Sequence, residues 1–86
     1  MGLVGLETTL RAAVSVNNYV NGVQSADPTQ AAVDSYFRNV ANGDSGFADL
    51  DAATAALEIS GGDAASAMAA WGTLQVVGEV FQDALR

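Results

Sequence analysis

DPTQAAVDSYFRNVANG, residues 27–43, carries the clearest start and stop signals for a helix in the chain. Asp27 is a favoured N-cap because its carboxylate can accept the free amides of a helix start, and Pro28 suits the first helical position. Gln30 completes a variant of the capping box. The Asn-Gly pair that closes the stretch can supply the left-handed residue that ends a helix. The stretch therefore predicts a helix over residues 28–41.

On both sides of this stretch, apolar residues recur with helical period in three further blocks, and turn residues separate the blocks. Asn-Gly at 21–22 and Ser-Gly-Gly at 60–62 are such breaks. Asp44 or Ser45 stands at the start of the third block and Asp63 at the start of the fourth, where they are expected to cap helices. The pattern predicts helices at residues 3–20, 28–41, 45–58 and 63–85. We expect an all-α protein, a small four-helix bundle-like domain over residues 1–86.

Each predicted helix has residues that recur with helical period along one face. In the first and third helices they step alternately by three and four residues, the spacing by which packed helices form a seam. These faces are Leu3, Leu6, Leu10, Ala13, Asn17 and Val20 in the first helix, and Val33, Tyr36, Phe37 and Val40 in the second. They are Phe47, Leu50, Thr54 and Leu57 in the third, and Met68, Trp71, Leu74, Gly78, Phe81 and Leu85 in the fourth. The four faces are expected to meet in the core.

The length of 86 residues favours association with other protein. So short a chain buries only about 60 to 65% of its unfolded surface, and a lone monomer of this size is marginally stable. Small proteins gain further stability from disulfides, structural metals or association. The chain has no Cys and no His, so disulfides are excluded and zinc lacks its usual ligands. Association is the remaining route.

The charge balance excludes several classes of partner. Three Arg and no Lys stand against ten acids, which gives a net charge of −7. Nucleic-acid and anionic membrane surfaces need clustered cations, so neither is an expected partner. The longest uncharged stretches, residues 12–26 and 64–78, hold fifteen residues each and are too short to cross a bilayer. We expect no membrane insertion.

Catalysis is not expected either. Without His, Cys or Lys, no serine or threonine has a base to take its proton. Asp49 and Asp51, the closest acidic pair, point apart on a helix, and no EF-hand pattern for calcium is present. The sequence therefore predicts no enzyme activity, no cofactor and no metal.

Most of the acids have a structural explanation. Three pairs place an Arg within one helical turn of an acid: Glu7 with Arg11, Asp34 with Arg38, and Asp83 with Arg86. Asp27, Asp44 and Asp63 fall at helix starts, where the helix dipole favours a carboxylate. Two interpretations stay open for the acids without a local role, a solvated face or a patch for a basic partner. These acids are Asp49, Asp51, Glu58 and Glu79.

The pair Asp44-Ser45 ahead of a helix resembles the attachment site of acyl carrier proteins, which are also acidic, four-helical and close to this length. The resemblance implies a cofactor arm on Ser45. Carrier proteins follow the modified Ser with Leu, whereas Gly46 follows here, and a capping Ser explains the same residue.

Trp71, the only Trp, has two open interpretations, a core residue or an interface anchor. Small residues form a stripe on another face of the same helix and would let a second helix approach closely. Valines of the first and fourth helices lie off the predicted seams, and some of them must face outward. The predicted interface residues are Val4, Val14, Val16, Ala65, Ala69, Gly72, Val76 and Val80.

The sequence thus favours a non-enzymatic structural subunit of a larger assembly, such as a virion decoration or capsid component or a filament subunit. Its expected partners are copies of itself, a larger structural protein, or both. The alternatives are a small acidic adaptor or inhibitor that binds one protein, and the carrier protein. No signal peptide is predicted, because the first basic residue is Arg11 and Glu7 interrupts the early apolar stretch. The expected location is a virion or an extracellular assembly, with the cytoplasm as the alternative.

Overall fold

The computed structural model describes residues 3–86, and within this range every regular element is a helix. The helices are α1 (Leu3–Asn21), α2 (Pro28–Ala41), α3 (Ser45–Ser60) and α4 (Ala64–Ala84). Each observed end lies within two residues of the predicted end. The prediction of an all-α, four-helix fold is confirmed.

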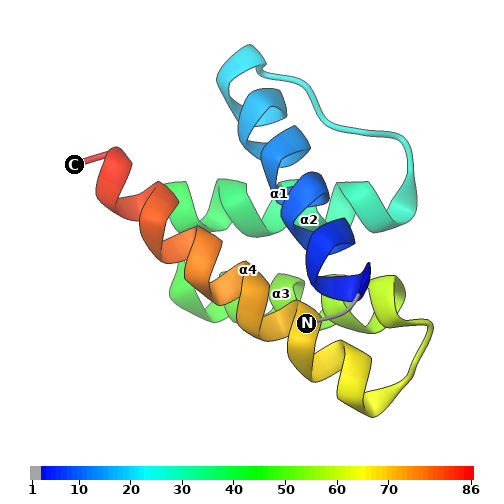
Figure 1. Cartoon of the computed structure of the whole chain (residues 1–86). Helices are drawn as coiled ribbons and strands as arrows, with labels where there is room; N and C mark the ends of the chain where they lie inside the picture. Colours follow the sequence, from blue (N-terminus) through cyan, green and yellow to red (C-terminus); the bar gives the residue numbers. More distant parts are fainter. Residues whose placement is uncertain (1–2) are drawn as a thin grey trace.

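The helices follow one another around the bundle. α1 packs mainly against α2 and α4, and α3 packs mainly against the same two helices. As a result, α1 and α3 lie at opposite corners (Figure 1). α2 and α3 run antiparallel (Figure 1). Near their C-terminal ends, α1 and α4 meet through the Tyr19 and Phe81 rings, with centroids 5.5 Å apart.

Two of the three predicted aspartate caps form as expected. The carboxylate of Asp27 accepts the Gln30 amide at 2.9 Å, and that of Asp63 accepts the Ser66 amide at 2.9 Å. Asp44 takes the N-cap position of α3, but its side chain accepts no hydrogen bond there. The first two aspartates therefore fix where α2 and α4 begin.

The stops after α2 and α3 depend on glycine. Gly43 follows α2 with a φ of 75°, and Gly61 ends α3 with a φ of 66°. L side chains rarely adopt this region, so the predicted breaks at these glycines are confirmed. The amide of the next residue closes each end, from Asp44 to the Asn39 carbonyl at 2.9 Å and from Gly62 to the Leu57 carbonyl at 3.1 Å.

All four helices contribute to the core, and its large side chains come from α2 and α4. Val33 and Phe37 of α2 and Leu74 of α4 are fully buried. The Phe37 ring meets those of Tyr36 and Phe81 edge to face, with centroids 5.0 and 5.3 Å apart. The predicted apolar face of α2 is thereby confirmed. The buried residues of α3 are all small, and Ile59 of the same helix packs half-buried against the core. The small residues are Ala48, Ala52, Ala55 and Ala56.

The faces predicted to pack inward on α1 and α3 were wrong. Leu3, Leu6, Leu10, Ala13, Asn17 and Val20 of α1 are all exposed, as are Phe47, Leu50, Thr54 and Leu57 of α3. The inward face of α1 consists of Gly5, Thr8, Ala12 and Ser15. Small residues let the helix backbones approach closely, and the two hydroxyl groups find hydrogen-bond acceptors inside the fold. The larger apolar side chains therefore point outward.

The predicted face of α4 is correct only in part. Leu74, Gly78 and Phe81 are buried, whereas Met68, Trp71 and Leu85 are exposed.

Close packing between α2 and α4 depends on Gly78. The Tyr36 hydroxyl donates a hydrogen bond to the Leu74 carbonyl at 3.0 Å, one turn before the glycine. A Cβ on Gly78 would clash with the Tyr36 hydroxyl and lie 2.9 Å from the Tyr36 Cζ. The glycine thus leaves room for the tyrosine ring against the α4 backbone.

A buried polar cluster joins α1 to α2. The Asp34 carboxylate, 3% exposed, accepts hydrogen bonds from Ser15 Oγ, Asn18 Nδ2, the Ser25 amide and Gln30 Nε2. Burial by itself would raise the pKa of Asp34, but these hydrogen bonds outweigh it and hold the pKa below its ordinary value. Through the Ser25 amide, the cluster also holds the segment that connects α1 and α2 against both helices.

Two predictions that involve residues of this cluster are wrong. Asp34 turns inward, so the predicted ion pair with Arg38 does not form, and Arg38 donates to Ser35 Oγ at 2.9 Å instead. The capping box is also absent, because the Gln30 side chain donates to the Arg11 carbonyl at 2.9 Å rather than accepting the Asp27 amide. The other two predicted ion pairs are present, at 3.0 Å for Glu7 with Arg11 and 3.9 Å for Asp83 with Arg86.

Candidate functional site

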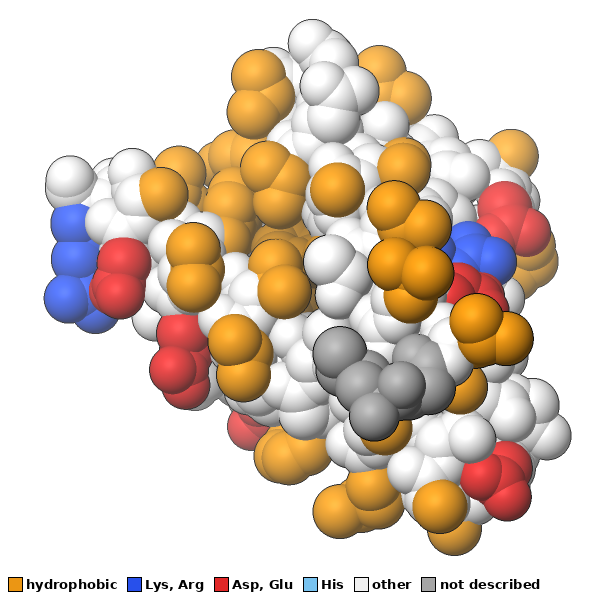
Figure 2. Space-filling model, in the orientation of Figure 1, with side chains coloured by type: hydrophobic (Ala, Val, Ile, Leu, Met, Phe, Trp, Pro, Cys, Tyr) orange, Lys and Arg blue, Asp and Glu red, His pale blue; other side chains and the backbone are white. Residues whose placement is uncertain are grey.

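Large apolar side chains are concentrated on the outside of this protein. Six of its seven leucines are exposed, and only Leu74 is buried. Figure 2 shows the face that α1 and α4 form, where hydrophobic side chains cover both helices and line the hollow between them, while charged side chains lie toward the edges. Most leucines elsewhere in folded proteins are found inside, so this distribution requires an explanation.

The exposed residues of α1 form a continuous stripe. We define the α1 stripe as Leu3, Leu6, Leu10 and Ala13, all exposed, with Leu3 at 84%. The steps of three, four and three residues keep these side chains on one face of the helix. Within residues 3–86, no other helix covers that face, because α2 and α4 pack against the opposite one.

A second stripe runs along α3. We define the α3 stripe as Phe47, Leu50, Thr54 and Leu57, with Leu50 at 64% exposure. Its steps are again three, four and three residues. Since α1 and α3 lie at opposite corners, the two stripes point to opposite sides of the molecule.

The α3–α4 groove is a third apolar surface. It has a volume of about 550 Å³ and lies between the C-terminal half of α3 and the N-terminal half of α4. Trp71 lines it at 40% exposure and Met68 at 69%. The groove answers the question left open for Trp71, which borders the solvent rather than the core. Its lining is Ala53, Ala56, Leu57, Ala64, Ala67, Met68 and Trp71.

Farther along the same two helices, where α2 also borders them, lies a separate acidic cavity. This cavity of about 150 Å³ is lined by Tyr36, Asp49, Gln75 and Glu79, among others. Burial, followed by the charges of Asp49 and Glu79, raises the pKa of Tyr36 to about 12. Both carboxylates therefore lie near enough to Tyr36 for their charges to contribute to this shift. Ser45, the residue that resembles a carrier attachment site, is exposed at the start of α3 and borders this cavity.

Comparisons of the chain with protein-family models, with curated proteins and with solved structures find no match. Its function must therefore be inferred from its own surfaces.

The predicted interface residues are distributed over α1 and α4. Val14, Ala65, Ala69, Val76 and Val80 are exposed, Val4 and Gly72 are half-buried, and Val16 is half-buried against the core. A shallow depression between the two helices brings together Ala69, Gly72 and Val76 of α4 beside Thr9 of α1. The structure thus brings these α4 residues together beside α1, whereas Val16 turns toward the core.

Sequence reasoning missed both stripes and the groove as surfaces. Their residues were recognised as periodic, but they were assigned to the core. One signal was available, because α3 has Ala48, Ala52, Ala55 and Ala56 opposite its stripe and so offers two apolar faces instead of one.

Two further properties concern classes of site. In the described part of the chain, no group of three or more acidic, histidine or cysteine residues is arranged to hold a metal ion. None of the helices in residues 3–86 combines the length and apolar character that crossing a membrane requires.

Proposed function

We propose that this protein is a non-enzymatic structural subunit of a larger protein assembly, a virion decoration or capsid component or a filament subunit. It acts by self-association and by contacts with other proteins. The observation that carries the proposal is the exposure of six of seven leucines, most of them in two stripes with the spacing of a helix-packing seam.

The energetics of the stripes favour coverage by protein. Fully burying one leucine contributes about 1.5 to 3 kcal/mol, so several exposed leucines represent a large unused driving force. The spacing of the stripes matches the spacing by which one helix packs into the grooves of another. A helix of a second copy can therefore cover a stripe. Each copy carries such helices, because both stripes lie on helices of this chain.

Replacing Leu10 or Leu50 with Asp tests the two stripes separately. Each variant should lower the self-association constant by about tenfold or more, because a charge would be buried in the apolar contact. Helix content should not change, since both residues are exposed in the folded subunit. Light scattering across protein concentration measures association, and circular dichroism measures helix content.

Gln24→Asp is the matched control, because it adds the same charge at an exposed polar residue outside both stripes. Its association constant should stay within about twofold of the wild type. Wild-type association should strengthen with salt, since each copy carries a net charge of −7 and salt screens the repulsion. A wild type that remains monomeric at high concentration and high salt would contradict self-assembly and favour the single-partner adaptor.

The predicted interface residues on α1 and α4 are tested by Val14→Asp and Val76→Asp. Both side chains are exposed, at 47% and 63%, so neither substitution should unfold the subunit. Each should weaken association about tenfold if this face is used in the assembly. Unchanged association constants for both variants would restrict the contacts to the stripes.

A further inference from the structure

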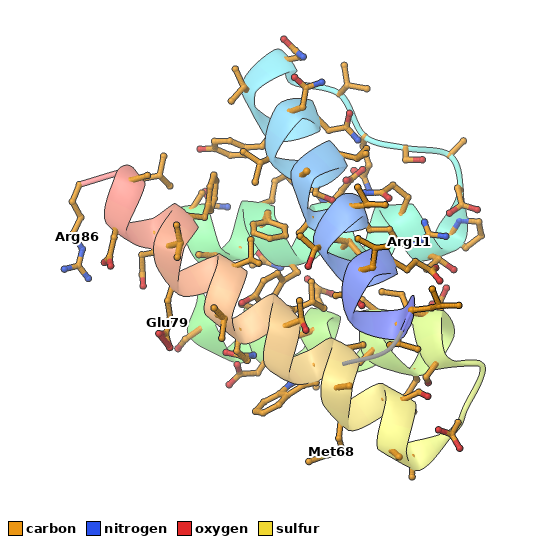
Figure 3. All side chains as sticks on the ribbon, viewed as in Figure 1. Arg11, Met68, Glu79 and Arg86 are labelled. Carbon is orange, nitrogen blue, oxygen red and sulfur yellow. The ribbon has the colours of Figure 1, made fainter. Side chains whose placement is uncertain are left out.

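Two hollows of different chemistry follow one another along α3 and α4, and we call the two together the α3–α4 depression. Its first part is the apolar α3–α4 groove with Trp71 and Met68, and its second part contains Asp49 and Glu79. Figure 3 shows Met68 and Glu79 projecting from the same side of α4, the side that faces away from α1. A ligand lying along this side would meet both parts.

The two acids in this depression have no partner within residues 3–86. The other acids without a local role do: Asp51 accepts Asn39 Nδ2 at 2.6 Å, and Glu58 accepts the Thr29 hydroxyl at 3.2 Å. Asp49 and Glu79 take part in no hydrogen bond or salt bridge in this range. Between the two parts, Gln75 Nε2 is buried and also lacks a hydrogen-bond partner among the described residues. Buried polar groups such as Gln75 Nε2 are normally satisfied, whereas the exposed carboxylates of Asp49 and Glu79 are free to meet a cation.

We propose that this depression binds a basic amphipathic helix of another protein. The apolar face of that helix would lie on Trp71 and Met68, and its Lys or Arg side chains would reach Asp49 and Glu79. Trp71 and Glu79 are separated by about 12 Å along α4, which corresponds to roughly two turns of a bound helix. A helix in an apolar groove flanked by complementary charges is a recurrent recognition mode.

The small number of cations in this chain favours another protein, rather than a second copy, as the occupant of the depression. The chain has no Lys and only three Arg. Arg11 is held by Glu7 and Asp27, and Arg86 lies 3.9 Å from Asp83. Arg38 forms no ion pair with any residue of the described range, but it is half-buried and donates to Ser35 Oγ. Two copies with net charges of −7 repel each other, whereas a basic helix is attracted. This surface shares no residue with the α1 stripe and only Leu57 with the α3 stripe, and its use does not depend on self-assembly.

The fluorescence of Trp71 reports peptide binding, because Trp71 is the only Trp and lines the α3–α4 groove. The probe is a synthetic amphipathic helix of Leu and Lys with about 18 residues, roughly five turns. At low salt, the peptide should bind and shift the Trp71 emission to shorter wavelength. Raising salt from about 50 to about 500 mM should weaken binding at least fivefold or so. The same peptide with Glu in place of every Lys should cause no shift.

The double variant Asp49→Asn/Glu79→Gln should weaken peptide binding by about fivefold or more. Glu7→Gln/Asp83→Asn is the matched control, because it removes the same number of charges from exposed sites outside the depression and should change binding less than about twofold. Equal effects of the two double variants would overturn the proposal, as would binding of a labelled peptide that leaves Trp71 emission unchanged.

The two proposals fail in distinguishable ways. Peptide binding is strongest at low salt, whereas self-association is strongest at high salt. A protein that binds the peptide but never associates contradicts only the assembly. Self-association without peptide binding would contradict only the proposal of a basic-helix site.

Discussion

Asp34→Ala is expected to lower the free energy of unfolding by about 3 kcal/mol or more. Four donors converge on this buried carboxylate, and hydrogen bonds to a charged group contribute about 1.5 to 3 kcal/mol each without being additive. The variant would leave these donors unsatisfied inside the fold. A domain of this length has a total stability of about 4 to 13 kcal/mol, so the loss is a large part of the total. Chemical denaturation followed by circular dichroism measures it.

The pH dependence of the same cluster has a defined sign. The pKa of Asp34 is lower in the folded protein than its ordinary value of 3.8, so its contribution is fully present above that value. The contribution is lost as pH falls through the lower folded pKa. The stability difference between wild type and Asp34→Asn should therefore shrink when the pH is lowered below about 4.

Asp83→Ala is the control for Asp34. Asp83 is an exposed acid whose only ion pair, with Arg86, spans 3.9 Å, so its loss should change stability by less than about 0.5 kcal/mol. Similar denaturation midpoints for Asp34→Ala and Asp83→Ala would contradict the assigned role of the buried cluster.

Gly78→Ala is expected to destabilise the protein by about 2 kcal/mol, although alanine is normally the better helix former. The added Cβ would clash with the Tyr36 ring and displace the hydroxyl from the Leu74 carbonyl. Gly72→Ala is the matched control on the same helix, because a Cβ there meets no atom within 4 Å. That variant should stabilise the protein by about 0.5 to 1 kcal/mol. Thermal unfolding of both variants gives the comparison.

A double-mutant cycle identifies the cause. If the Tyr36 hydroxyl produces the clash, Gly78→Ala should cost less in a Tyr36→Phe background than in the wild type, by about 1 kcal/mol. An unchanged cost would assign the effect of Gly78→Ala to another contact.

Local signals were sufficient to predict the helices. Asp27, Asp63 and the glycines after α2 and α3 act on the backbone within a few residues, so their effect can be recognised without knowing the rest of the fold. The observed ends consequently lie close to the predicted ones.

Which face turns inward could not be predicted in the same way. α1 offers leucines on one face and Gly5, Thr8, Ala12 and Ser15 on the other, and hydrophobicity alone selects the leucines. The structure places the small residues inside because Asp34 and Gln30 of α2 supply polar partners for Ser15. Such long-range contacts are invisible to periodicity. For the same reason, Asp34 was assigned to a surface ion pair with Arg38.

The candidate site was predicted in composition but not in place. Exposed valines on α1 and α4 were expected, whereas the groove at Trp71 was not. Asp49 and Glu79 were recognised as acids without a local role, but they are thirty residues apart in sequence, so only the antiparallel packing of α3 and α4 brings them to one cavity.

The opposite placement of the α1 and α3 stripes has a consequence for growth. In the proposed assembly, a subunit with an apolar stripe on each of two sides can make two contacts. A contact on one side leaves the other available for the next copy, so the product is an extended array. A subunit with only one working side, such as the Leu50→Asp variant, can still join the end of an array but cannot be extended. It would therefore act as a chain terminator, and the mean length of wild-type arrays would fall as its share of the mixture rises.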